Sequence, residues 1–207
     1  MKIILLGAPG SGKGTLAKQI SKDFNIPQIS TGDLFRAAIR EKTPLGKEIE
    51  NLMASGGLVP DEITVSVLKE RIAKEDCQKG FILDGFPRSI NQAIALEKMT
   101  TIDAIILIDL DFETIIERLS GRRTCPTCSE IYNTRSHSSE TCDKCRATLV
   151  QRDDDKPASI KHRLEVYETT TSPLINFYSD RLFKVSGEGS PEDTYEPVKT
   201  YLNGLEG

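Results

Sequence analysis

Short apolar runs alternate with stretches of helical spacing along most of this chain. Five runs predict strands, four of them strongly apolar and the second one weaker: 3–6, 28–30, 81–84, 104–109 and 182–186. Between them, apolar residues recur three and four positions apart, as in Phe112, Ile115, Ile116 and Leu119, which line one helix face. Strands that alternate with helices predict an α/β fold with a doubly wound, five-stranded parallel sheet flanked by helices.

Two stretches interrupt this alternation. Residues 31–59 hold helical segments without a strand, and residues 122–153 hold four cysteines and little helical periodicity. We expect both to be insertions on the sheet, because neither continues the alternation of strands and helices. The predicted division is a core of residues 1–30, 60–121 and 156–207, an insert of 31–59 and a lid of 122–155.

Composition and charge narrow the function classes. The chain has 207 residues, of which 28% are charged and 38% hydrophobic, as is ordinary for a globular protein. A net charge of −4 argues against a general surface for nucleic acid or membranes. The first apolar run is too short for a signal peptide or a membrane span, so we expect a cytoplasmic location.

A glycine-rich loop follows the first strand. Its sequence is Gly7-Ala8-Pro9-Gly10-Ser11-Gly12-Lys13-Gly14-Thr15, and a helical pattern begins at Gly12. A strand, a glycine loop and a helix in this order are typical of a P-loop, whose backbone N–H groups bind phosphate. We expect Lys13 to reach the outer phosphates and Thr15 to place its hydroxyl near Mg²⁺. An ordinary glycine-rich turn is the alternative.

Two further constellations follow other strands. Thr31-Gly32-Asp33-Leu34-Phe35-Arg36 begins a helix, which Thr31 or Asp33 could simply cap. Asp84-Gly85-Phe86-Pro87-Arg88 ends another strand, and Gln92 lies four residues beyond Arg88. Ligands of open α/β sheets gather at the carboxyl ends of strands. Asp84 is therefore a candidate for holding the water shell of Mg²⁺.

With these motifs the chain resembles the nucleoside monophosphate kinases, and most closely the adenylate kinases. The resemblance covers nearly the whole chain and includes Leu58-Val59-Pro60-Asp61-Glu62 besides the segments above. It implies the Mg-dependent reaction ATP + AMP = 2 ADP, with a monomeric protein and nucleotides as its partners. It also implies an AMP site formed by Thr31, Arg36, Met53, Leu58, Val59, Gly85, Arg88, Gln92, Arg152 and Arg163. Met53 and Leu58 are equally compatible with a core position.

The same resemblance assigns the remaining site residues. The ATP site would comprise Gly10, Ser11, Gly12, Lys13, Gly14, Thr15, Arg118, Arg122, Tyr132 and Gly189, although packing within the lid also explains Tyr132. The transition-state charge would be held by Lys13, Arg88, Arg122, Arg152 and Arg163. Asp154 and Asp155 resemble the acidic pair at the lid hinge, and an acidic cluster before a helix is their other interpretation.

Four of the five cysteines form two pairs. Cys125-Pro126-Thr127-Cys128 and Cys142-Asp143-Lys144-Cys145 are separated by 13 residues. Two Cys-x-x-Cys pairs predict a tetrahedral zinc site, and four protein ligands indicate a structural role. A redox pair is the main alternative, and His137 is a weaker ligand candidate. Zinc-bearing lids of this kind occur in many bacterial adenylate kinases.

The sequence leaves alternatives open both for the base of the acceptor nucleotide and for the class of activity. Thr31 and Gln92 favour AMP, because the family's UMP/CMP kinases typically have alanine and asparagine there. A side-chain amide can present a donor and an acceptor to the N1/N6 edge of adenine. GTP:AMP transfer or UMP/CMP phosphorylation would keep the same fold. A P-loop switch without transfer and a zinc-ribbon nucleic-acid binder are alternatives of other classes.

Overall fold

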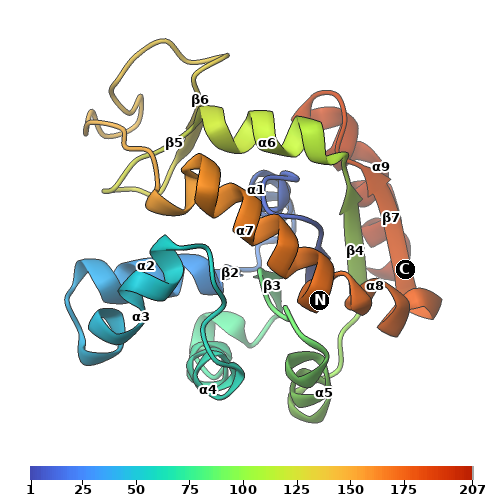
Figure 1. Cartoon of the computed structure of the whole chain (residues 1–207). Coiled ribbons are helices and arrows are strands. Elements are labelled where there is room, and N and C mark those ends of the chain that lie inside the picture. The colour runs from blue at the N-terminus through green and yellow to red at the C-terminus, as the bar shows by residue number, and fades with distance from the viewer. Residues whose placement is uncertain (207) are drawn as a thin grey trace.

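The computed structural model describes residues 1–206 and builds from them a five-stranded parallel sheet (Figure 1). The strand order is β2-β3-β1-β4-β7, and all four pairings are parallel. The strands are β1 (Lys2–Leu6), β2 (Gln28–Ser30), β3 (Phe81–Asp84), β4 (Ala104–Asp109) and β7 (Leu182–Ser186). Only β1 departs from the predicted bounds, by one residue. The predicted doubly wound sheet is confirmed.

Helices cover both faces of the sheet because the side chains of each strand alternate between them. On one face Ile3 and Leu5 of β1 pack with α1 (Lys13–Phe24) and α9 (Pro191–Glu206). On the other, Ile4 and Leu6 belong to the core cluster formed with α4 (Asp61–Ile72), α5 (Ile90–Met99) and α8 (Pro173–Phe177). Within residues 1–206, no helix is both long and apolar enough to cross a membrane.

The remaining core elements connect the sheet to the insertions. The helices α6 (Phe112–Gly121) and α7 (Pro157–Val166) share a small core cluster that contains Ile115 and Leu164. A π-helical turn, η3 (Tyr167–Thr171), joins α7 to α8. Short 3-10 turns complete the elements: η1 (Glu75–Cys77), η2 (Asp153–Asp155) and η4 (Ser179–Arg181).

Residues 31–59 form a helical pair, α2 (Thr31–Arg40) and α3 (Pro44–Ala54), with its own core of Phe35, Ile49 and Val59. Ser30 caps α2, because its hydroxyl accepts a hydrogen bond from the Asp33 N–H at 3.2 Å. The alternative interpretation, in which Thr31 or Asp33 caps this helix, is wrong. The Thr31 hydroxyl instead donates to the Gly85 carbonyl, and the Asp33 carboxylate pairs with Arg36.

The cysteine-rich stretch folds around a two-stranded antiparallel sheet of β5 (Arg122–Thr124) and β6 (Ile131–Asn133). It contacts two other parts of the protein. Lys18 of α1 forms an ion pair with Glu130 at 3.0 Å, and Arg40 of α2 donates to the Pro126 carbonyl at 3.3 Å. The stretch therefore extends from the P-loop helix to the helical insert.

The close approach of α2 and α3 generates a prediction. A Cβ atom at Gly46 would overlap the backbone carbonyl of Ala38. We expect Gly46→Ala to lower the free energy of unfolding by about 1–3 kcal/mol, as overpacking does elsewhere. Gly204→Ala is the matched control in α9, since no atom lies within 4 Å of its Cβ position. Urea unfolding of both variants checks the prediction, and equal stabilities would contradict it.

Candidate active site

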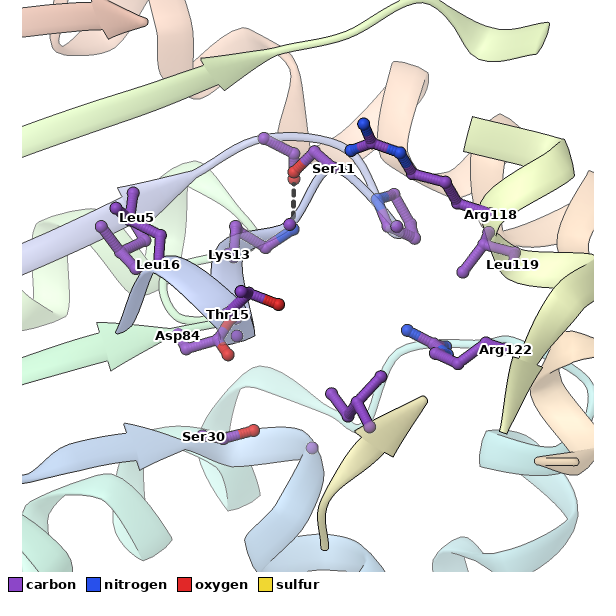
Figure 2. Close-up of a pocket in the computed structure, with 18 of the residues that line it drawn as sticks. Leu5, Ser11, Lys13, Thr15, Leu16, Ser30, Asp84, Arg118, Leu119 and Arg122 are labelled. Atoms are coloured by element: carbon purple, nitrogen blue, oxygen red, sulfur yellow. Dashed lines mark hydrogen bonds between the residues drawn. The ribbon is translucent and has the colours of Figure 1, made fainter. Parts of the chain in front are cut away.

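One cavity of about 900 Å³ opens at the carboxyl ends of β1 and β3. Figure 2 shows Lys13, Thr15 and Asp84 on one side of it and Arg118 and Arg122 on the other. The predicted residues that line it are Gly10, Ser11, Gly12, Lys13, Gly14, Thr15, Arg36, Met53, Leu58, Asp84, Gly85, Arg88, Arg118, Arg122, Tyr132, Arg152, Arg163 and Gly189. The chain thus brings together side chains that are far apart in sequence.

A smaller pocket adjoins this cavity between the insert and α5. Its lining includes Thr31, Met53, Leu58, Val59, Gly85, Arg88 and Gln92. Met53, Leu58, Gly85 and Arg88 line both spaces. Met53 also packs against the core of the insert, so its two interpretations are compatible.

The glycine loop bends sharply into α1. Gly10 and Gly12 have φ angles of 87° and 104°, a region that favours glycine. Gly12 is also the N-cap residue, and glycine has no side chain to occupy the first N–H groups of the helix. The ammonium group of Lys13 donates to the carbonyl oxygens of Gly7 and Ala8, each at 2.8 Å. The loop thus combines a helix N-terminus with a buried cation, as anion sites do.

Burying these cations costs free energy unless an anion is bound beside them. Desolvation is the largest cause that lowers the pKa of Lys13, Asp84 opposes it, and the net result with Arg88, Arg163 and Arg122 is a pKa of about 8. Burial and the nearby Arg163 lower the pKa of Arg88 to about 10. Burial and Arg36 lower the pKa of Arg152 to about 9. Bound phosphates would reverse these shifts, since opposite charge favours the ionised form.

Two aspartates hold part of the arginine cluster. Asp155 is fully buried and accepts from Arg122 at 2.5 and 2.7 Å and from Arg163 at 2.9 Å. Arg163 also pairs with Asp154 at 3.0 Å. Burial opposes the ionisation of Asp154, but the pKa of its carboxyl is lowered by Arg163 and its neighbours. These contacts join β5 to α7 and agree with the hinge role that the resemblance implies.

Contacts of the smaller pocket involve residues to which the sequence assigned no role. Gln92 accepts from the Arg88 N–H at 2.7 Å and donates to Asp61 at 2.6 Å. The carbonyl of Arg88 accepts from Thr171 at 2.9 Å. Asp61 lies in the segment Leu58-Val59-Pro60-Asp61-Glu62, and this motif was the one signal in the sequence that pointed to it. Thr171 gave none, because 83 positions separate it from Arg88.

Arg118 and Tyr132 both line the large cavity. Arg118 donates to the Gly187 carbonyl at 2.9 Å and so faces the loop that contains Gly189. The Tyr132 hydroxyl lies 3.3 Å from the Cys142 sulfur and accepts from the Asp143 N–H at 3.0 Å. Its ring packs on His137, with centroids 4.3 Å apart. Packing within the cysteine-rich stretch therefore accounts for Tyr132, and a base contact stays a prediction.

The four paired cysteines converge on one point. The sulfur atoms of Cys125, Cys128, Cys142 and Cys145 all lie within 4.8 Å of one another. Three of the separations are 3.3, 3.5 and 3.7 Å, far longer than the bond of about 2.05 Å in a disulfide. Among residues 1–206 this cluster consists of cysteines alone, so His137 is outside it. Its geometry suits a metal ion better than a redox pair.

Residues 5–182 match the sequence model of the family described as "Adenylate kinase". The chain belongs to the adenylate kinase family. A curated adenylate kinase of Thermodesulfovibrio yellowstonii is 48% identical, over 98% of this chain and 99% of that protein. One from Clostridium novyi is 46% identical over 99% of both chains, and one from Clostridium botulinum strain Loch Maree is 47% identical over 98% of both. The family that the sequence motifs resemble is thereby confirmed.

The lowered pKa of Lys13 predicts that phosphate binding is linked to protonation. Above about pH 8 the ligand-free ammonium loses its proton. A bound triphosphate raises the pKa again, so ATP binding should take up a proton near pH ~8.5 and weaken by up to about tenfold per pH unit above pH ~8. Calorimetry in buffers of different ionisation enthalpy measures this uptake.

Two variants test whether Lys13 is the source. Lys13→Arg should reduce the proton uptake to the part that Arg152 contributes, because a guanidinium holds its proton more strongly than an ammonium. Lys22→Met, in the same helix but exposed, should keep it. Wild-type protein that binds ATP at pH ~8.5 without taking up protons would contradict the account.

Proposed function

We propose that this chain catalyses reversible, Mg-dependent phosphoryl transfer, ATP + AMP = 2 ADP. The family assignment supports the reaction class. One observation carries the proposal: the large cavity, which is lined by a cluster of cations, adjoins a second pocket. A P-loop borders the large cavity, a second pocket adjoins it, and Arg88 lines both. Transfer between two nucleotides needs such a pair of sites, whereas a nucleotide-dependent switch needs only one.

ATP would bind in the large cavity. The N–H groups of Gly10 to Thr15 and the ammonium of Lys13 would hold its β- and γ-phosphates. Arg122 would add charge from β5. Arg118 would stack on the base beside Gly189, and its contact with the Gly187 carbonyl supports that orientation. Tyr132 borders the same cavity and would face the nucleotide from the lid.

AMP would bind at the end of the large cavity where the smaller pocket opens into it. Thr31, Met53, Leu58, Val59, Gly85 and Gln92 would surround its base and ribose, as their common lining supports. Arg36 and Arg88 would grip its phosphate, because a guanidinium fork matches two phosphate oxygens. Arg152, whose pKa is lowered by Arg36, and Arg163, which lowers the pKa of Arg88, would contact the same phosphate.

Catalysis would come from positioning and electrostatics. The transferring phosphoryl group spreads negative charge over its oxygens, and Lys13, Arg88, Arg122, Arg152 and Arg163 would stabilise it. The parts that close around it would be the insert 31–59 and the lid 122–155, on a core of 1–30, 60–121 and 156–207. The Lys18–Glu130 and Arg40–Pro126 contacts support closure over the site. Closure excludes water and so disfavours hydrolysis.

A magnesium ion would accompany ATP. Oxygen ligands suit this ion, and the carboxylate of Asp84 lies 3.5 Å from the Cβ position of Gly14, next to Thr15 in the chain. Asp84 would hold the water shell of the ion, and the Thr15 hydroxyl would face it. When bound, magnesium neutralises charge on the β- and γ-phosphates.

The lid would carry a structural zinc ion. Four sulfurs bound to zinc at about 2.3 Å lie about 3.8 Å apart, close to the separations of 3.3 to 3.7 Å here. Four protein ligands leave no open position for chemistry, so the ion would stabilise the lid only. A cytoplasmic monomer stays a prediction from the resemblance.

The function is tested by ADP formation from Mg·ATP with and without AMP. We expect ADP only when AMP is present, with two ADP formed per AMP consumed. CMP, UMP and GMP in place of AMP, and GTP in place of ATP, test the other base preferences. Loss of ATP that is indifferent to the acceptor would contradict the proposal and favour a hydrolase or a switch.

Two arginine variants serve as a matched pair for this assay. Arg88→Ala should lower turnover by about 10²–10³-fold, the effect of removing one donor that stabilises developing charge. Arg123→Ala should retain turnover, since Arg123 donates to the backbone oxygens of Ser120 and Arg122. Equal turnover of the two folded variants would show that Arg88 has no special role.

Metal removal provides a further prediction. Stripping zinc should lower the melting temperature by roughly 5–15 °C, because metal binding contributes folding free energy. Returning zinc should restore it, while ATP affinity of the core changes little. Cys142→Ser should lose the metal, whereas Cys77→Ser, outside the cluster, should keep one ion per chain. An unchanged melting curve after verified removal would exclude the structural role.

A further inference from the structure

The amide of Gln92 is held in one orientation by contacts at both ends. Gln92 is only 1% exposed. Its Oε1 accepts from the Arg88 N–H at 2.7 Å, and its Nε2 donates to Asp61 Oδ1 at 2.6 Å. A backbone N–H can only donate and a carboxylate can only accept. These two partners therefore determine which end of the amide is oxygen and which is nitrogen.

Asp61 is itself held from its other side. It is the first residue of α4, where the helix dipole favours a carboxylate. Its Oδ2 accepts from the Ser89 hydroxyl at 2.8 Å, and the Ser89 oxygen in turn accepts from the Gln92 N–H at 3.1 Å. Asp61 is absent from the pocket lining among the described residues, whereas Gln92 belongs to it. Asp61 thus acts on the pocket through Gln92.

The fixed orientation has a chemical consequence for a bound purine. A primary amide has two N–H donors and two lone pairs, so Gln92 keeps one of each after these contacts. Adenine offers an acceptor at N1 and a donor at its 6-amino group. A 6-oxopurine offers the reverse, a donor at N1 and an acceptor at O6. An amide that could turn by 180° would suit both bases equally.

Turning the Gln92 amide is disfavoured in this protein. It would set Oε1 against the Asp61 carboxylate and the NH₂ group against the Arg88 N–H. Two hydrogen bonds would be lost and two repulsive contacts would replace them. The Arg88 N–H belongs to the backbone and is present in every variant. The carboxylate of Asp61 is the part of this clamp that substitution can change.

We infer that Asp61 is a specificity-determining positioning residue, which selects adenine against 6-oxopurines by holding the Gln92 amide in one orientation. This inference rests on the proposed function, because it requires that AMP bind in the pocket lined by Gln92. It adds to that function a physical reason why AMP is selected as the acceptor, which is the fixed orientation of the Gln92 amide.

The test compares AMP with IMP, which carries the reversed edge without the 2-amino group of GMP. We expect wild-type enzyme to favour AMP strongly in kcat/KM with Mg·ATP. Asp61→Asn keeps the size of the side chain but offers Gln92 a donor as well as an acceptor. It should lower the ratio of kcat/KM for AMP to kcat/KM for IMP by about tenfold or more, chiefly through KM. The loss of one good paired contact has an effect of this size in base recognition. Glu62→Gln, an exposed neighbour in the same helix turn, should leave the ratio unchanged.

The outcomes separate the inference from the function on which it rests. A parallel loss for AMP and IMP in Asp61→Asn, with the ratio unchanged, would overturn the inference and leave Asp61 a structural role. Wild-type protein inactive with AMP would overturn the proposed function itself. Should Asp61→Asn fail to fold, Ser89→Ala removes one support of Asp61 and should narrow the ratio less, in the same direction. An unchanged ratio in folded Ser89→Ala would then count against the inference.

Discussion

Positive charge buried around an anion-sized space is the constraint on which the rest of this structure depends. Lys13, Arg88 and Arg152 all have lowered pKa values, and burial is the first cause in each case. Asp154 and Asp155 compensate only part of this charge, through Arg122 and Arg163. The folded chain therefore carries an electrostatic cost that bound phosphates relieve, which couples its stability to its ligands.

The topology explains how so many cations reach one place. The sheet supplies the P-loop after β1 and the Arg88 loop after β3, two neighbouring strands whose carboxyl ends share one edge. The other cations come from separate elements, with Arg36 on α2, Arg118 on α6, Arg122 at the start of β5 and Arg163 on α7. In the proposed closure, the segments 31–59 and 122–155 would move their charges over the site and exclude water. Phosphoryl-transfer enzymes that exclude water need this kind of closure.

Features with local causes were predictable from the sequence. The strand bounds follow from apolar runs buried on both faces, and the cysteine cluster follows from the spacing of its pairs. Other features depend on contacts between distant residues. Ser30, Thr31 and Asp33 are all acceptable caps, and only the end of β2 selects Ser30. The contact of Asp61 with Gln92 spans 31 positions, so the motif that contains Asp61 indicated its presence and not its role.

In the proposed function, one cation cluster brings two nucleotides together. The most direct measurement is the stoichiometry of ADP binding to the full chain in the presence of Mg²⁺, by calorimetric titration. ADP is the product at both positions, so it can occupy each of them. The account predicts two ADP bound per chain at saturation. A single ADP per chain would contradict this expectation, because Arg88, which lines both spaces, would then serve only one nucleotide.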